Sequence, residues 1–377
     1  MPLIYLVAGE ASGDVLGARL MSALRSRRGD LTFAGIGGER MISQGLSSLF
    51  PIRELALMGL LEVLPHLRQL RQRLHQTAAD IEKCRPDVVV TIDSPDFTLR
   101  VLRAIRGSKA KRVHYVAPHV WAWRESRVKR YPGLWDQLLC LLPFEPDFFA
   151  RYDLPAVFVG HPVLESGANT GDVTRFRARH DIDPAARVLT VMPGSRRTEV
   201  SRLLPILGAT LRRLPDVLPV VPVATLVMDA VRTGTRNWPR QPILVTEESD
   251  KFDAFAASAA ALTKSGTSSL ELAMAGVPMV VTYRINPLSA AIARRLIKVR
   301  YASIVNLIAE REIIPELIQE ACTPARLASA VQELLDDRDA AEAQRTACRS
   351  VLDMLRPDAG MPSESAAEAV LALLKQT

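Results

Sequence analysis

Short runs of apolar, mostly β-branched residues alternate along this chain with longer stretches in which apolar residues recur at helical spacing. The runs are residues 3–8, 87–92, 112–116, 137–142 and 156–160 in the first half, and 187–192, 217–224, 242–246, 260–265 and 278–283 in the second. Runs of this length without polar alternation are typical of parallel strands buried on both faces. The pattern therefore predicts two α/β units in tandem.

Chain length and composition suggest where these units begin and end. A chain of 377 residues is longer than one hydrophobic core usually supports, so two domains are expected. Residues 160–176, rich in Gly, Asn and Thr, are interpreted as the linker region. We predict one domain over 1–165, a second over 166–350 and a separate C-terminal helix over 351–377.

The composition is that of a globular protein with a basic surface. Hydrophobic residues make up 48% of the chain and charged residues 24%, which excludes the class of disordered chains. The net charge of +7 favours an anionic partner, which could be nucleic acid, a phosphorylated substrate or an acidic membrane face.

Cysteine usage and hydropathy limit the compartment and the membrane contact. The cysteines are widely scattered and form no C-x-x-C pair, which fits a reducing compartment and indicates neither a zinc nor a redox motif. The N-terminus lacks a basic segment before its apolar run, which argues against a signal peptide. No apolar segment reaches spanning length, so we expect any membrane contact to be peripheral.

Polar loops follow two of the predicted strands in the first half, where ligands of open α/β sheets bind. Residues 9–14, GEASGD, either form a turn capped by Ser12 or Asp14, or offer free N–H groups to a polar substrate. They carry no dinucleotide fingerprint. Asp93 and Asp96, after the strand 87–92, either shape a turn or, in the case of Asp93, remove a proton from a hydroxyl.

Two loops of the second half are candidates for nucleotide binding. Gly194, Ser195 and Arg196 stand between a strand and a helix, and they would form either an anion clamp suited to a diphosphate or a capped turn with solvated arginines. A similar junction follows the strand 260–265, and Glu271 stands one turn into the next helix. That carboxylate would accept ribose hydroxyls or remain a surface charge.

One stretch combines an apolar face with basic edges. In residues 57–76, Leu67, Leu70 and Leu74 fall on one helical face, flanked by arginines and histidines, as in an interfacial helix or a core helix with solvated edges. Residues 115–130 add two tryptophans and several basic side chains. Because basic residues attract anionic lipids and tryptophan favours the headgroup zone, we favour a surface that faces a phosphorylated lipid.

These motifs together resemble the lipid-A-disaccharide synthases, inverting glycosyltransferases of the GT-B fold. The matching segments run in order through the chain: LVAGEASGD, LALMGLLEVLPHL, IDSPDF, HYVAPHVWAWRESRVK, LLPFE, FVGHP, MPGSRRTEV, SGTSSLE, PMVVTYRINPL and NLIAEREIIPELIQ. Each motif is weak alone, and their order and number make the match specific. His119, in the fourth segment, stands where the family more often has a small or amide side chain, and we assign it no catalytic role.

The resemblance implies a fold, a reaction and partners. The fold would be α/β, with two Rossmann-like domains whose parallel sheets face a central cleft and C-terminal helices that return to the first domain. The enzyme, a hexosyltransferase, would transfer 2,3-diacylglucosamine from its UDP derivative to the 6-hydroxyl of 2,3-diacylglucosamine 1-phosphate, forming a β-1,6-linked disaccharide phosphate and UDP. It would act in the cytoplasm on the inner face of the inner membrane, often as a homodimer exchanging its C-terminal portion, without metal, cofactor or nucleic acid.

The resemblance also implies roles for individual residues. Asp93 would be the general base, with Glu10 and Ser12 near the reacting sugar. The substrate-binding residues would be Gly13, Asp96, Ser195, Arg196, Ser265, Gly266, Thr267, Glu271 and Asn306. Two classes of alternative remain. One is another GT-B enzyme, such as the UDP-GlcNAc 2-epimerase or the undecaprenyl-linked muramoyl-peptide transferase, and the other is a non-catalytic basic protein that binds nucleic acid or membranes.

Overall fold

The computed structural model describes residues 1–55, 60–286, 290 and 294–375, and for residues 60–67 it describes the backbone alone. The chain forms two compact units. One consists of Met1–Pro162 with Leu355–Thr377, and the other of Val163–Met354. The chain therefore passes between the units twice, after Pro162 and after Met354.

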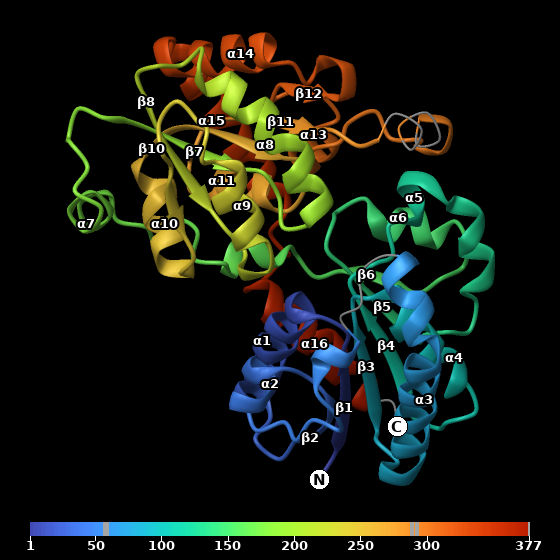
Figure 1. Ribbon diagram of the computed structural model, residues 1–377. Helices are drawn as coiled ribbons and strands as arrows, with labels where there is room; N and C mark the ends of the chain where they lie inside the picture. Colours follow the sequence, from blue (N-terminus) through green and yellow to red (C-terminus); the bar gives the residue numbers. More distant parts are fainter. Residues whose placement is uncertain (56–59, 287–289, 291–293, 376–377) are drawn as a thin grey trace. The chain divides into compact units, whose positions relative to one another are not determined.

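The first unit is built on a parallel sheet. Its strands, among the described residues, are β1 (Leu3–Ala8), β2 (Thr32–Ile36), β3 (Val88–Ile92), β4 (Lys111–Tyr115), β5 (Gln137–Cys140) and β6 (Ala156–Phe158), in the spatial order β2-β1-β3-β4-β5-β6. Its helices are α1 (Ala11–Arg27), α2 (Glu39–Ser43), η1 (Ile52–Glu54), α3 (Leu60–Cys84), α4 (Pro95–Ala104), α5 (Val120–Trp123), η2 (Glu125–Arg130), α6 (Glu145–Ala150) and α16 (Pro362–Leu374). Figure 1 shows helices on both faces of this sheet.

Alternating side chains of the buried strands explain this layering. Tyr5 and Val7 of β1 enter one core together with residues of α4, whereas Ile4 and Leu6 enter the opposite core with residues of α1 and α16. Both faces are apolar, so helices must cover both. The C-terminal helix α16 lies beside α1, although the two are at opposite ends of the chain (Figure 1).

The second unit repeats the plan. Its strands in the described part of the chain are β7 (Arg187–Met192), β8 (Val217–Pro222), β9 (Ile243–Val245), β10 (Ser258–Lys264), β11 (Met279–Tyr283) and β12 (Glu316–Ile318), in the order β12-β11-β10-β7-β8-β9. The helices are η3 (Pro162–Glu165, beginning at the unit boundary), α7 (Val173–Arg179), α8 (Arg197–Leu211), η4 (Thr225–Val227), α9 (Met228–Gly234), α10 (Glu248–Ala257), α11 (Ser268–Met274), α13 (Ile304–Ala309), η5 (Gln319–Ala321), α14 (Pro324–Asp336) and α15 (Arg338–Met354).

Each strand predicted from the apolar runs is present, and all the strand pairs are parallel. The prediction of two α/β units is therefore confirmed. Strands β2 and β12 were not predicted, because β2 contains Gly35 and begins at an exposed Thr32, while β12 begins with Glu316 and lies outside any apolar run of strand length.

Candidate active site

Both sheets reverse their strand order at one point, and the predicted residues follow the strands on either side of it. In the first sheet the chain moves outward from β1 to β2 and, in the other direction, from β3 to β6. In the second sheet it moves from β7 to β9 and from β10 to β12. The loops after β1 and β3, and after β7 and β10, therefore adjoin at a topological switch point, where open α/β sheets bind ligands.

The loops after β1 and β3 touch each other because of a glycine. A Cβ atom on Gly9 would lie 2.3 Å from the Cβ of Ser94, so a larger residue would push the loops apart. Gly13 has a related role, since a Cβ there would lie 3.3 Å from the carbonyl oxygen of Ile92. The structure thus gives Gly13, a predicted substrate-binding residue, a packing function as well.

Asp93 is held in a strained backbone conformation at this junction. Asp93 and Ser94 have φ angles of +52° and +44°, in the left-handed region that non-glycine residues rarely occupy. Such residues cost about 1–3 kcal/mol each and cluster at functional sites. The Asp93 N–H donates to Tyr115 O (2.9 Å), and the Thr98 hydroxyl donates to Asp93 O (2.6 Å), so hydrogen bonds on both sides fix the conformation.

The half-buried carboxylate of Asp93 is partly engaged. Its Oδ1 accepts the Ser94 N–H at 2.8 Å, while Oδ2 accepts no hydrogen bond from the described residues. One carboxylate oxygen is therefore available to take a proton. Asp96, three residues later in the first turn of α4, is exposed.

The polar residues of the GEASGD loop make two kinds of contact, one within the loop and one with the start of α2. The Ser12 hydroxyl donates to Glu10 Oε1 at 2.9 Å, and these two predicted catalytic residues are thereby brought together. Neither Ser12 nor Asp14 caps α1, whose N-cap is Glu10. The buried Asp14 instead accepts backbone N–H groups from Gly38, Arg40 and Met41, at 2.7–3.0 Å, and starts α2. The expectation that Ser12 or Asp14 caps the loop's own helix is therefore wrong.

The two tryptophans of residues 115–130 also differ in role. The Trp121 indole N–H donates to Glu145 Oε1 at 3.0 Å, and its ring packs edge-on against Phe144. Trp123 is 40% exposed, and the Arg124 guanidinium lies 4.0 Å from its ring centre. Trp121 is thus a structural residue, and Trp123 belongs to the surface.

Glu145 is a buried carboxyl group that was not among the predicted site residues. Its Oε2 accepts the N–H groups of Leu141 and Leu142, both at 3.0 Å, and it is 1% exposed. Burial raises its pKa from 4.5 to about 7, although its hydrogen bonds act in the opposite direction. Glu145 joins the loop after β5 to the helix that carries Trp121.

In the second unit, the loop after β7 is organised by a buried carboxylate. Gly194 has a φ of +112°, and a Cβ there would lie 2.5 Å from Glu199 Oε2. The Arg196 N–H donates to the same oxygen at 3.4 Å. The exposed side chains of Ser195 and Arg196 leave the loop toward solvent, which suits the predicted anion clamp.

The loop after β10 is tied to a neighbouring segment. The Ser265 hydroxyl donates to Ala302 O at 2.7 Å, and Gly266 has a φ of +148°. Thr267 is exposed at the start of α11. The carboxylate of Glu271, in the first turn of α11, is half-buried and pairs with Lys251 Nζ at 3.0 and 3.2 Å. Glu271 is thus held in place by α10 and is not the free surface charge considered as its alternative.

Asn306 does not offer its amide to a ligand in this structure. It is fully buried, and its Oδ1 accepts the N–H groups of Ile313 and Ile314 at 2.8 and 2.9 Å. Its Nδ2 donates to Ile314 O and to Glu316 Oε1, at 2.7 and 2.8 Å. The side chain therefore fixes the segment that also receives Ser265, so its influence on a site would be indirect.

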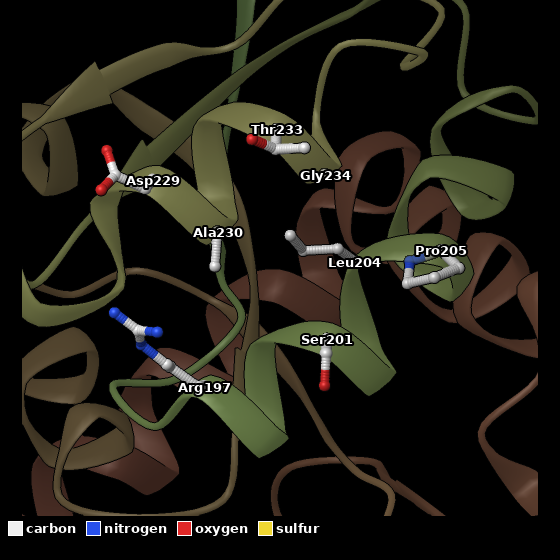
Figure 2. Close-up of a pocket in the computed structure, with 8 residues that line it drawn as sticks. All are labelled: Arg197, Ser201, Leu204, Pro205, Asp229, Ala230, Thr233 and Gly234. Carbon is white, nitrogen blue, oxygen red and sulfur yellow. The ribbon is translucent and has the colours of Figure 1, made fainter.

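A pocket of about 500 Å³ lies in the second unit, and Arg197, which lines it, directly follows the loop after β7. Figure 2 shows Arg197, Ser201, Leu204 and Pro205 of α8 on one side and residues of α9 on the other. None of the predicted site residues lines it. The pocket is therefore a separate feature of the α8 and α9 surface.

The helix predicted to lie on a membrane is, in its described part, a core helix. Leu70 and Leu74 pack against the core of the first unit, and Arg73 pairs with Glu54 at 2.6 Å. In this part the structure fits the alternative of a core helix with solvated edges, because Leu70 and Leu74 are partly buried against the protein. The side chain of Leu67, and those of the other residues in 56–67, lie outside the described residues.

Within the described residues, no helix combines the length and apolar character needed to cross a membrane. No group of three or more His, Cys, Asp or Glu side chains in that part of the chain converges as a metal ion requires.

The sequence matches one protein family over nearly its whole length. The model of the family described as lipid-A-disaccharide synthetase matches residues 4–370. The lipid-A-disaccharide synthase of Gluconobacter oxydans is 58% identical over 378 residues, which cover 99% of this chain and 91% of the relative. That of Granulibacter bethesdensis is 56% identical over 390 residues, covering 100% and 99%.

Solved structures agree on the fold. The UDP-GlcNAc 2-epimerase of Neisseria meningitidis, bound to UDP-GlcNAc, aligns with a TM-score of 0.65 at 12% identity, over 100% of both chains. Acinetobacter baumannii MurG aligns with a TM-score of 0.57 at 12% identity, over 99% of this chain and 100% of that one. At such identities the likeness shows the fold alone, and that fold is GT-B.

The buried Glu145 predicts a pH dependence of stability. Because its pKa is raised from 4.5 to about 7, the folded state keeps a proton that the unfolded state loses, so this group's contribution to stability falls as pH rises through that window. In Glu145→Gln this loss is absent. The free energy of unfolding of the variant, relative to the parent, should therefore increase between about pH 5 and 7 and level off above it. Urea denaturation across this range measures it, with Asp147→Asn, an exposed carboxylate of α6, as control. Parallel pH profiles for Glu145→Gln and the parent would contradict the assignment.

Proposed function

The chain belongs to the lipid-A-disaccharide synthetase family, and from this premise we propose the reaction and the residues that perform it. It is a glycosyltransferase of lipid A biosynthesis. The donor is UDP-2,3-diacylglucosamine and the acceptor is 2,3-diacylglucosamine 1-phosphate. The products are the β-1,6-linked disaccharide 1-phosphate and UDP. The observation that carries this proposal is the family match over residues 4–370.

The first unit supplies the base. Asp93 Oδ2 removes the proton of the acceptor's 6-hydroxyl as its oxygen attacks the anomeric carbon of the donor. The bond between that carbon and the diphosphate oxygen breaks, and its electron pair leaves with UDP. The strained backbone of Asp93 supports this role, because its hydrogen bonds with Tyr115 of β4 and Thr98 of α4 keep the residue at the switch point.

Glu10 and Ser12 act beside Asp93. Their mutual hydrogen bond gives the loop after β1 a fixed polar surface, and the contact of Gly9 with Ser94 keeps that loop against Asp93. Glu10 and Ser12 therefore orient the reacting sugar, while the exposed Asp96 lies near enough in sequence to contact the acceptor.

The second unit holds the donor. Ser195, Arg196 and the N–H groups at the start of α8 bind the diphosphate. The loop formed by Ser265, Gly266 and Thr267 borders the nucleotide, and Glu271, kept in place by Lys251, accepts the ribose hydroxyls. Asn306 supports this loop indirectly, because its amide donates to Glu316, which also accepts the N–H of Ala302, the residue that receives the Ser265 hydroxyl.

The acyl chains and phosphates of the substrates call for a membrane surface, and the first unit offers a basic one. Exposed cations are carried by α4, by η2 and by Arg106, which follows α4 and donates to Pro132 O, just after η2, at 2.8 Å. They are Arg100, Arg103, Arg106, Arg127, Lys129 and Arg130. We place peripheral membrane binding, on the cytoplasmic side of the inner membrane, at this basic surface.

The proposal includes a homodimer that exchanges its C-terminal portion. Helix α16 buries Ala366, Ala367 and Val370 in the core of the first unit, so the same apolar surface would receive the equivalent helix of a second copy. Neither nucleic acid nor a metal is part of the mechanism proposed.

The alternatives fit the chain less well. The 2-epimerase and MurG share the fold at 12% identity, whereas the family match extends over residues 4–370 at up to 58% identity with relatives. A non-catalytic basic protein would have no use for a strained aspartate at the switch point of its sheet.

Asp93→Asn should abolish turnover without loss of donor binding. With both lipid substrates supplied, UDP release should fall by about 100-fold or more, the usual contribution of a general base, while UDP affinity stays within about threefold. UDP release by the parent should require the acceptor. Asp147→Asn is the control. Undiminished UDP release from Asp93→Asn would remove this residue as the base.

Glu271→Gln should weaken UDP binding only by removing the contact with the ribose hydroxyls. The parent should bind UDP about tenfold more tightly than 2′-deoxy-UDP, because a charge-assisted hydrogen bond to the 2′-hydroxyl is lost in the analogue. The variant should bind the two ligands almost equally, as calorimetry measures. Glu333→Gln, an exposed carboxylate of α14, is the control. A variant that still discriminates between the two would show that another group reads the ribose.

Replacing Arg127, Lys129 and Arg130 by Gln should weaken vesicle binding. Each basic residue near an anionic surface contributes about 1 kcal/mol, so co-sedimentation with vesicles containing anionic lipid should drop by about tenfold or more. Neutral vesicles should show no such difference. Gln at three exposed arginines of the second unit, Arg212, Arg213 and Arg236, provides the matched control. Equal losses in both triple variants would point to net charge rather than to this surface.

A further inference from the structure

Lys264, which the sequence analysis did not single out, ends the central strand β10 at the switch point of the second sheet. Its neighbours in the sheet are β7 and β11, and the loop after β7 carries Arg196. Its side chain is 20% exposed, so the ammonium group reaches the surface of this edge without extending into solvent. A cation in this position faces the same loops as a bound nucleotide would.

The ammonium group is held by Glu199. Lys264 Nζ lies 3.5 Å from Glu199 Oε1, and the carboxylate, whose side chain is 6% exposed, stands in the first turn of α8. Arg196 Nη1 lies 3.9 Å from the same oxygen, with a side chain that is 61% exposed. One carboxylate therefore serves two cations, and this group of three side chains keeps a net positive charge.

Two glycines leave room around this group. A Cβ on Gly266 would lie 3.4 Å from Lys264 Nζ, and a Cβ on Gly194 would lie 2.5 Å from Glu199 Oε2. Both glycines have positive φ angles, +148° and +112°, which other residues rarely adopt. The Lys264–Glu199 pair thus lies between the loop to which the donor's diphosphate is assigned and the loop of residues 265–267, which borders the nucleotide.

We propose that Lys264 is a second cation for the diphosphate of the nucleotide sugar, and that Glu199 is its positioning residue. This inference rests on the proposed function and deepens it. When the bond between the anomeric carbon and the diphosphate oxygen breaks, the electron pair remains on that oxygen and the diphosphate gains one negative charge. An ammonium group already in place stabilises this charge as it develops. Arg196, which is largely exposed, needs to be ordered by the ligand, whereas Lys264 is ordered beforehand.

A purely structural ion pair is the competing explanation, because a buried carboxylate needs a counter-charge. The two explanations differ in what happens when both charges are removed. A structural pair is replaced without loss by the neutral double variant Lys264→Met/Glu199→Gln. If Lys264 binds the diphosphate, the double variant does not recover UDP affinity, because the cation is still missing.

The experiment compares UDP, measured by calorimetry, with uridine, measured by ligand-observed NMR, on the full-length protein. In Lys264→Met, UDP affinity should fall by about tenfold or more while uridine affinity changes by less than about twofold. Lys264→Arg should keep most of the UDP affinity, and the double variant should stay as weak toward UDP as Lys264→Met. With the lipid substrates, kcat should fall further in Lys264→Met than in Lys264→Arg.

Three results would overturn the inference. They are an equal loss of UDP and uridine affinity in Lys264→Met, an unchanged UDP affinity in that variant, and recovery of UDP affinity in the double variant. Thermal melting of each variant identifies a folding defect. If Lys264→Met is unfolded, UDP and uridine affinities are compared in Lys264→Arg instead. A parent protein that does not bind UDP would refute the proposed function itself. If the parent binds UDP and Lys264→Met binds it equally well, only the role of Lys264 is refuted.

Discussion

The reversal of strand order within each sheet is the constraint on which the rest of the structure depends. Parallel strands need crossover helices, and right-handed crossovers place those helices on opposite faces on the two sides of the reversal. The loops after β1 and β3, and after β7 and β10, are therefore adjacent without a helix closing the edge between them. Backbone N–H groups and polar side chains gather there because both faces of each sheet are fully occupied by apolar packing.

The polar residues near the switch points differ in whether the fold already uses all their hydrogen-bonding groups or leaves some of them for a ligand. Asp14 accepts three backbone N–H groups, and the amide of Asn306 uses both its oxygen and its nitrogen twice. These side chains are buried and their capacity is consumed by the fold. Asp93 differs, because within the described residues a single N–H occupies its carboxylate, and Arg196 differs because its guanidinium is mostly exposed. The same motifs thus contain both kinds of residue.

The sequence predicted the architecture well because buried parallel strands leave an unmistakable apolar pattern, as in residues 88–92 and 187–192. It predicted the switch-point loops because these follow such strands. It failed where tertiary contacts decide. Leu70 and Leu74 have the same spacing in a core helix and in a membrane helix, and only the packing partner distinguishes them. Lys264 was missed because a lysine that ends an apolar run looks like a solvated terminus until Glu199, 65 residues earlier in the sequence, is seen beside it.

The switch-point loops of the two units carry opposite charge, and the chemistry of glycosyl transfer explains why. The loops at residues 9–14 and 93–96 contain acidic residues and no Lys or Arg, whereas residues 193–197 and 264–267 contain basic residues and no Asp or Glu. An acceptor hydroxyl must lose a proton, which a carboxylate takes up, and a departing diphosphate gains negative charge, which cations stabilise. A carboxylate and a cation at the same switch point would pair with each other, as Glu199 does with Lys264, and each would lose part of its effect. Distributing the two charges over two sheets leaves Asp93, the proposed base, without a cation partner among the described residues and leaves the cations in excess.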